Sequence, residues 1–344
     1  MPLLKSSSLT SVANGALTSN QMVYIFLGFL VIIMAVMFIK KIIYRYRYKK
    51  RYYILPRTNI KGISYIAMVV ALSVAIIILL TIITYNSLAV LFRSFPGTRI
   101  TLEGILIKIG GLLFGPFIGM FIGGATDMLT IALTAGVFHY GYFIAALTYG
   151  LLGGFIRTLV VFSKRKEWKF ALYSSISLIL TCVGICLFLL GTVANWDVEL
   201  PLSISVLGKD LSFKILHIIL LISVMNSVGI LAIMFFYFVS KKSKKKWIKN
   251  QFMTFCPVIS LVFISEVIVN LFMLPVFDAD ISTLSYSHWI TIRSLLFIPL
   301  VLGNIIVIWP IYKIIYPLVG YKYEQDVIED IHIPLINQKE KVWS

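Results

Sequence analysis

The sequence predicts an all-α polytopic membrane protein, and three observations lead to this fold class. Of the 344 residues, 59% are hydrophobic and only 13% are charged, and the mean hydropathy is +0.94. Several apolar runs approach or exceed the roughly 20 residues that a helix needs to cross a bilayer. The runs are continuous, whereas the strands of a membrane β-barrel would alternate in hydrophobicity over short segments. We therefore expect a helical bundle in a membrane.

Nine apolar segments are expected to form the membrane-spanning helices. They lie at about 22–39, 62–85, 99–114, 117–134, 141–162, 170–193, 212–239, 252–275 and 290–318.

The formal net charge of +17 is concentrated in short segments between these spans. The segments read KKIIYRYRYKKRYYILPRTNIK, KRKEWK and KKSKKKWIKN. If the nine helices cross alternately, all three segments and the C-terminal tail share one side. Asp197, Glu199, Asp278 and Asp280 then fall on the other side. The positive-inside rule places the C-terminus in the cytoplasm and the N-terminus outside the cell membrane. Anionic lipid headgroups account for the basic segments, so no nucleic-acid partner is expected.

Motifs for catalysis, metals and cofactors are absent from the sequence. Cys182, Cys186 and Cys256 lie within apolar spans, as small buried side chains do, and no Cys/His spacing suggests a metal. There is no G-x-x-x-x-G-K-[ST] loop, no His-Glu-x-x-His run and no nucleophile elbow. We expect neither a cofactor nor catalytic residues. The sequence therefore contains no ATPase motif of its own.

A small-residue stripe with one acid runs through GLLFGPFIGMFIGGATDMLTIAL. Gly115, Gly119, Gly123 and Asp127 recur every four residues and share one helix face. Small residues allow membrane helices to approach closely, so Asp127 is expected on the packed side. An acid inside a membrane is either a functional group or a polar tie between helices, and both interpretations stay open. Gly115-Pro116 predicts a tight turn between two helices.

Two further stripes are expected to pack against other helices. One consists of Ala67, Ala71 and Ala75, and the other of Ala146, Gly150 and Gly154. The alanine stripe suits either internal packing or contact with a partner protein.

These motifs resemble those of the S components of energy-coupling factor transporters. GGLLFGPFIGMFIGGATDMLT is similar to the family pattern G-x-L-F-G-P-x-x-G-x-x-x-G-x-x-x-D, and AMVVALSVA resembles its Ala-x-x-x-Ala signature. VIVNLFMLPVF and SHWITIRSLLFIPLVLGNIIVI are similar to the folate-type members, with Asn270, Arg293 and Pro299 at matching positions. Folate-type members usually carry an aromatic-Pro-Gly-Phe run between the fourth and fifth helices, where this sequence reads AGVFHYGYFIAAL, without the proline.

The resemblance implies a six-helix core with about three additional helices. Core helices 1–4 would occupy 62–162 and core helices 5–6 would occupy 252–318. Residues 1–61 would form an anchor helix and a basic loop, 163–251 an inserted helix pair, and 319–344 a cytoplasmic tail. The resemblance also implies a vitamin bound near the outer face, a transmembrane coupling subunit at the alanine stripe, and two cytoplasmic ATPase subunits.

Several polar and aromatic residues are expected near that outer face. The loop after the second helix carries Phe92, Arg93 and Phe95, and Arg99 follows it. Arginine can form a bidentate ion pair with a ligand carboxylate, and aromatic rings can stack on a planar heterocycle. We assign Arg99 to the ligand and Arg93 to the membrane interface. Glu103 lies one turn beyond Arg99 and is expected to form an ion pair with it.

Residues from later segments complete the expected ligand site. They are Asp127, His139, Tyr140, Tyr142, Asn270 and Arg293. For the histidine and tyrosines, an aromatic belt at the membrane interface is an equally good explanation. Asn270 lies in an apolar span and must contact another helix or a ligand. Lys108 is expected to extend towards the cytoplasmic surface, and a pair with Asp127 is left open.

The leading hypothesis is therefore a membrane subunit that binds folate or a related vitamin. An S component for riboflavin, thiamine or another vitamin is the first alternative. An ion-coupled secondary transporter that uses Asp127 and Lys108 as a proton relay is a second, although no inverted repeat is evident. An intramembrane enzyme is a third, and it would need a polar partner for Asp127, which the sequence does not reveal.

Overall fold

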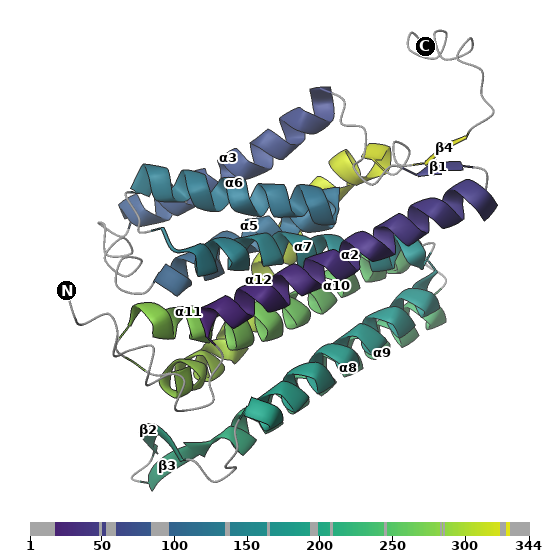
Figure 1. Ribbon diagram of the computed structural model, residues 1–344. Coiled ribbons are helices and arrows are strands. Elements are labelled where there is room, and N and C mark those ends of the chain that lie inside the picture. The colour runs from purple at the N-terminus through teal and green to yellow at the C-terminus, as the bar shows by residue number, and fades with distance from the viewer. Residues whose placement is uncertain are drawn as a thin grey trace.

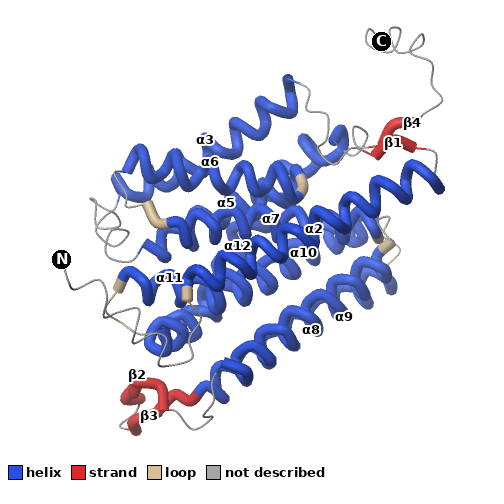
Figure 2. The backbone as a smooth tube through the Cα atoms, in the orientation of Figure 1, coloured by secondary structure: helices blue, strands red, loops and turns tan. Residues whose placement is uncertain are grey.

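The computed structural model is predominantly helical (Figures 1 and 2). It describes residues 18–47, 50–52, 60–83, 96–134, 138–163, 166–192, 199–206, 209–243, 246–282, 284, 286–323 and 328–330. The long helices are α2 (Ser19–Arg47), α3 (Ile60–Ile83), α5 (Pro96–Phe114), α6 (Pro116–Thr134), α7 (Tyr140–Phe162), α8 (Glu167–Thr192), α9 (Ile215–Lys242), α10 (Lys246–Ser265) and α12 (Tyr286–Tyr323). Between α10 and α12 lie a π-helix, η1 (Glu266–Met273), and α11 (Leu274–Ile281).

Every predicted apolar segment overlaps one of these helices. Within the described residues, eight helices are long and apolar enough to cross a membrane, so the prediction of a multi-pass membrane protein is confirmed. Helix α5 is not among the eight because it carries Arg99, Glu103 and Lys108 within 19 residues. It nevertheless lies inside the bundle, packed against α3, α6, α7 and α12.

Two small antiparallel ladders lie at opposite ends of the bundle (Figures 1 and 2). At one end, β1 (Lys50–Tyr52) pairs with β4 (Ile328–Asp330). At the other end, β2 (Glu199–Val206) pairs with β3 (Lys209–Lys214) between α8 and α9. The sequence analysis did not predict either ladder. Strand β1, which lies in the basic segment, and the β2–β3 hairpin, which carries Glu199 and Asp210, are therefore at opposite ends of the bundle (Figure 1), as alternate crossing requires.

The backbones of α5, α6 and α7 approach one another closely because glycines line their contacts. A Cβ atom added at Gly150 would lie within 3.0 Å of the Gly119 carbonyl oxygen, and one at Gly119 would meet Gly150 in return. Gly123 faces the Ala146 backbone in the same way, and Gly154 faces Pro116. The predicted glycine stripe of α6 therefore packs on the predicted small-residue stripe of α7. Asp127, on the same face of α6, is fully buried as expected.

Gly115 and the three residues of the alanine stripe behave differently from the other predicted stripe residues. Gly115 has a φ of 97° and forms the turn between α5 and α6. An added Cβ there would come no closer than 4.0 Å to another residue, so Gly115 acts in the turn and not in helix packing. Ala67, Ala71 and Ala75 are exposed on α3, so internal packing does not explain the alanine stripe.

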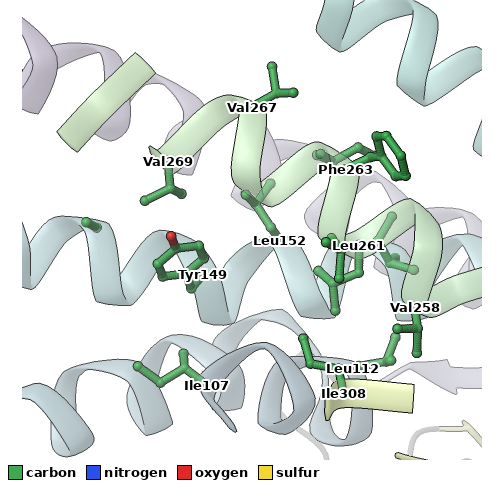
Figure 3. Packing of buried hydrophobic residues seen from close by; sticks show 14 of the residues in the cluster. Ile107, Leu112, Tyr149, Leu152, Val258, Leu261, Phe263, Val267, Val269 and Ile308 are labelled. Atoms are coloured by element: carbon green, nitrogen blue, oxygen red, sulfur yellow. The ribbon is translucent and has the colours of Figure 1, made fainter. Parts of the chain in front are cut away.

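Apolar side chains fill the space between this unit and the later helices. Ile107 and Leu112 of α5, Leu152 of α7, and Leu261 and Phe263 of α10 belong to one buried cluster (Figure 3). Helices α8 and α9 pack against each other and against α10, and the Asn226 side chain of α9 donates to the Leu178 carbonyl at 2.8 Å. Helix α2 packs on α7 and α11. The three helices outside the expected core thus pack on its outer side, against α7, α10 and α11.

Gly150→Ala tests the close packing of α6 and α7. We expect it to lower the free energy of unfolding by about 1–3 kcal/mol, since the added methyl group must push two backbones apart. Thermal unfolding of the purified chain in detergent would measure the change. Gly184→Ala is the matched control, because nothing lies within 4 Å of its added Cβ and alanine is the better helix former. Equal stability of the two variants would contradict the packing argument.

Candidate functional site

Charged side chains buried inside the bundle form the candidate site. Within the described residues, α5 contributes Arg99, Glu103 and Lys108, each at most 2% exposed. Other helices bring Asp127, Glu266, Asp278 and Arg293, also buried. Charges inside a membrane are costly unless they are paired, and they usually mark functional sites. The seven residues fall into three groups, each of which joins different helices.

The first group joins α5 to α6. The Arg99 Nη2 donates to Asp127 Oδ1 at 2.5 Å, and Arg99 Nε lies 3.2 Å from Glu103 Oε1. The predicted pairing of Arg99 with Glu103, one turn apart on α5, is therefore confirmed as a contact between the two side chains. The expectation that Asp127 has no evident partner is wrong, because a sequence cannot show that the start of α5 lies beside the second half of α6. Asp127 Oδ2 and both Glu103 oxygens make no hydrogen bond within the described structure.

The second group joins α5 to η1 and α12. Lys108 donates to Glu266 Oε1 and to Asn304 Oδ1 at 3.1 Å, and its ammonium lies 4.4 Å from the centre of the Tyr149 ring. Lys108 is fully buried, so the expectation that it extends to the cytoplasmic surface is wrong. Its partner is Glu266 and not Asp127. The lysine stays inside because a carboxylate, an amide oxygen and an aromatic face surround it there.

The third group joins η1, α11 and α12 to α7. Arg293 donates from Nε and Nη2 to Asp278 Oδ2 at 2.7 and 2.5 Å, and from Nη1 to Asn270 Oδ1 at 2.5 Å. The Tyr142 hydroxyl donates to Asp278 Oδ1 at 2.6 Å. Three predicted site residues, Tyr142, Asn270 and Arg293, are thus brought together. The Asn270 Nδ2 has no partner in the described structure.

Aromatic rings lie next to this third group. The His139 ring centre is 4.6 Å from that of Tyr140, 5.3 Å from Tyr142 and 6.1 Å from Phe277. Gly141 N–H donates to His139 Nδ1 at the start of α7, which requires an unprotonated Nδ1. Burial lowers the pKa of His139, while the nearby Asp280 and Asp278 act in the opposite direction. Tyr140 is exposed and Tyr142 is buried. The aromatic residues predicted for the ligand site therefore do not all face the interior of the bundle.

The described structure does not bring all the predicted residues to one point. Arg99 and Asp127 belong to the first group, whereas Tyr142, Asn270 and Arg293 belong to the third. Arg93, Phe92 and Phe95 lie outside the described residues, so their predicted roles stay predictions.

Sequence reasoning missed several members of these groups. Glu266, Asp278, Asn304 and Tyr149 were not assigned to the site. Glu266 and Asn304 carried a usable signal, because each is an isolated polar residue within an apolar segment. A single sequence could not show that the π-helix η1 lies opposite α5, or that Asp278 is drawn into the bundle by α11. The eight residues of η1 hold both Glu266 and Asn270, and π-helical turns frequently occur at functional sites.

The comparisons with known proteins give a relative without an assigned function. No family model matches the sequence, and no solved structure matches it. The chain is 29% identical over an alignment of 348 residues to a Mycoplasma pneumoniae (strain ATCC 29342 / M129 / Subtype 1) protein described as "Uncharacterized protein MG098 homolog". The alignment covers 89% of this chain and 72% of that protein. The similarity therefore extends over most of the helical bundle.

Lys108→Met tests the buried pair at the centre of the site. Because Glu266 would lose its cation and would have to remain charged or take up a proton inside the bundle, we expect the free energy of unfolding to fall by about 3–5 kcal/mol. Adding Glu266→Gln should restore most of that loss, since no uncompensated charge would remain. A double-mutant cycle by thermal unfolding in detergent would measure both effects. Additive losses in the double variant would show that the two side chains do not interact.

Proposed function

We propose that the chain is the substrate-binding membrane subunit of an energy-coupling factor type uptake transporter, with folate or a related vitamin as its ligand. The ligand would enter from the outer face of the cell membrane, and partner ATPases would supply the energy for transport. The N-terminus would lie outside and the C-terminus in the cytoplasm. Nine membrane passages, including the charged α5, would give this orientation.

The observation that carries the proposal is the grouping of Arg293, Asn270 and aromatic rings where α7, α11 and α12 meet. The Arg293 guanidinium is held by Asp278 and would exchange this carboxylate for that of a ligand. The unpartnered Asn270 amide is a donor suited to a ligand oxygen. The rings of His139, Tyr142 and Phe277 lie within 6.4 Å of one another, so they pack as one aromatic cluster that a planar heterocycle could join. A vitamin with an aromatic ring system and an anionic tail suits this chemistry.

The exposed alanines of α3 support the part of the proposal that concerns partners. Ala67, Ala71 and Ala75 are exposed, and small side chains let another membrane helix approach closely. Their spacing resembles the surface by which S components engage a transmembrane coupling subunit. The basic segments next to α3, α8 and α10 would lie on the side that the ATPases occupy.

An ion-coupled secondary transporter is the second candidate, and the buried Lys108–Glu266 pair favours it. Intramembrane ionisable pairs are common in proton pathways. This alternative differs from the first in its source of energy. Uptake by the isolated chain in liposomes under a proton gradient, without ATPases, would support the second candidate and contradict the first.

Equilibrium binding to the purified chain tests the ligand. We expect saturable folate binding that weakens at least about tenfold in Arg293→Lys. Lysine keeps a positive charge beside Asp278, but its ammonium cannot form a bidentate pair with a carboxylate. Arg45→Lys on the exposed face of α2 is the matched control and should bind as the original chain does. Competition with riboflavin and thiamine would identify another vitamin. Absence of saturable binding to any vitamin would contradict the proposal.

Co-purification tests the partner surface. In Ala71→Leu, the recovery of the coupling subunit and ATPases should fall by about tenfold or more, since the larger side chain prevents close helix contact. Ala132→Leu introduces the same change at an exposed alanine of α6 and should leave recovery unchanged. Protein gels of both preparations, made in mild detergent, would measure recovery. Equal recovery from the two variants would remove α3 as the docking face.

A further inference from the structure

Among the described residues, the buried charges do not balance, and the imbalance is confined to one group. The second group has one cation, Lys108, and one carboxylate, Glu266. The third group likewise has Arg293 and Asp278. The first group has one cation, Arg99, and two carboxylates, Glu103 and Asp127. With every group ionised, the first group would hold one uncompensated negative charge, and its side chains are at most 3% exposed.

An uncompensated buried carboxylate is too costly to persist in a membrane interior. Transfer of an isolated charge from water into such surroundings is so unfavourable that the group neutralises instead. The surplus negative charge must therefore be matched by one positive charge, which would be either a proton or a bound cation.

The arrangement of the oxygens favours a proton. Within the described residues there is no group of three His, Cys, Asp or Glu side chains that could hold a metal ion. The Arg99 guanidinium lies against both carboxylates, and its charge would repel a metal cation there. A proton needs no coordination shell. We propose that the cluster of Arg99, Glu103 and Asp127 is a proton-binding site that carries one exchangeable proton on Glu103.

Hydrogen-bond geometry places the proton on Glu103 and not on Asp127. Asp127 accepts a bond of 2.5 Å from Arg99 Nη2, which stabilises its ionised form. Glu103 lies 3.2 Å from Arg99 Nε, but neither of its oxygens accepts a hydrogen bond. The Thr130 hydroxyl of α6 is near Glu103 and makes no hydrogen bond in the described structure, so it is free to accept a hydrogen bond from a neutral Glu103 carboxyl.

Among the residues that the structure describes, the surroundings of the cluster supply no second cation to replace this proton. Helix α6 presents Asp127 and Thr130, and α7 presents Tyr142 and Tyr149, which are neutral. Arg293 on α12 and Asp278 on α11 neutralise each other. The buried residues of α3 include no titratable side chain.

The place of Glu103 in α5 makes exchange with one side of the membrane reasonable. Glu103 lies seven residues after Pro96, where α5 begins, which is about 10 Å along the helix. This end of α5 is opposite the end that meets α6 at Gly115. By the alternate-crossing topology it is the outer end, so the proton would exchange with the external side. The site itself does not depend on the proposed vitamin transport, because it follows from the charge count and the contacts alone.

Infrared difference spectroscopy of the full-length chain in detergent, between about pH 5 and 9, tests the proposal. We expect the carbonyl band of one protonated buried carboxyl at neutral pH, and its loss in Glu103→Gln. In Asp127→Asn, Arg99 is free to pair with Glu103, so the band should weaken at least about tenfold at neutral pH. Glu103→Gln removes the protonated carboxyl, whereas Asp127→Asn removes the competing carboxylate. If one of the two variants fails to fold, the other still tests the proposal. Size-exclusion chromatography would confirm that each variant is monodisperse.

The double variant Lys108→Met with Glu266→Gln is the matched control. It removes a buried carboxyl from a balanced pair, so the protonated band should persist unchanged. A spectrum of the original chain that contains only carboxylate bands, with or without a bound monovalent cation, would overturn the proposal. Loss of the band in the control, together with its survival in Glu103→Gln, would also overturn it.

Discussion

Close contact between the backbones of α5, α6 and α7 is the constraint on which the rest of the structure depends. The α6–α7 contact involves Gly119 against Gly150, and Gly123 against Ala146, with no room for a Cβ atom. Gly111 of α5 meets Gly150 as well. In a membrane, helix association relies on packing and on polar contacts between helices, so this surface of small residues fixes how the three helices sit. The turn at Gly115 and Pro116 sets α5 and α6 antiparallel, which brings Arg99 beside Asp127.

The charged side chains of α5 are tolerable only because of that placement. With Arg99, Glu103 and Lys108, the helix is less apolar than its neighbours, and an isolated α5 would be a poor membrane span. Inside the bundle, Arg99 meets Asp127 of α6, and Lys108 meets Glu266 and Asn304 from the far side. Polar interactions thus replace the lipid-facing hydrophobic surface that α5 lacks. Helix α5 is consequently stable only in the interior of the bundle.

The sequence predicted the helices better than it predicted their contacts. Long apolar runs and basic segments reveal membrane helices through composition alone, so each predicted range overlaps an observed helix. The four-residue spacing of Gly119, Gly123 and Asp127 correctly placed Asp127 on a packed face. The sequence did not show which charged residues pair, because Arg99 and Asp127 are 28 residues apart along the chain, and Lys108 and Glu266 are 158 apart. Contacts of such separation depend on how whole helices pack, which a single sequence does not show.

The polar contacts also divide the bundle into two parts with different kinds of attachment. Within α5, α6 and α7, glycine packing and the Arg99–Asp127 pair hold the backbones directly together. Towards η1, α11 and α12, the described polar ties run through the long side chains of Lys108 and Tyr142. Long side chains can keep a hydrogen bond through small shifts of a helix, whereas a backbone contact between glycines cannot. If the protein opens to admit a ligand, we therefore expect the opening between α7 and the α11–α12 corner, where Tyr142, Asp278 and Arg293 meet, and not within the glycine-packed unit.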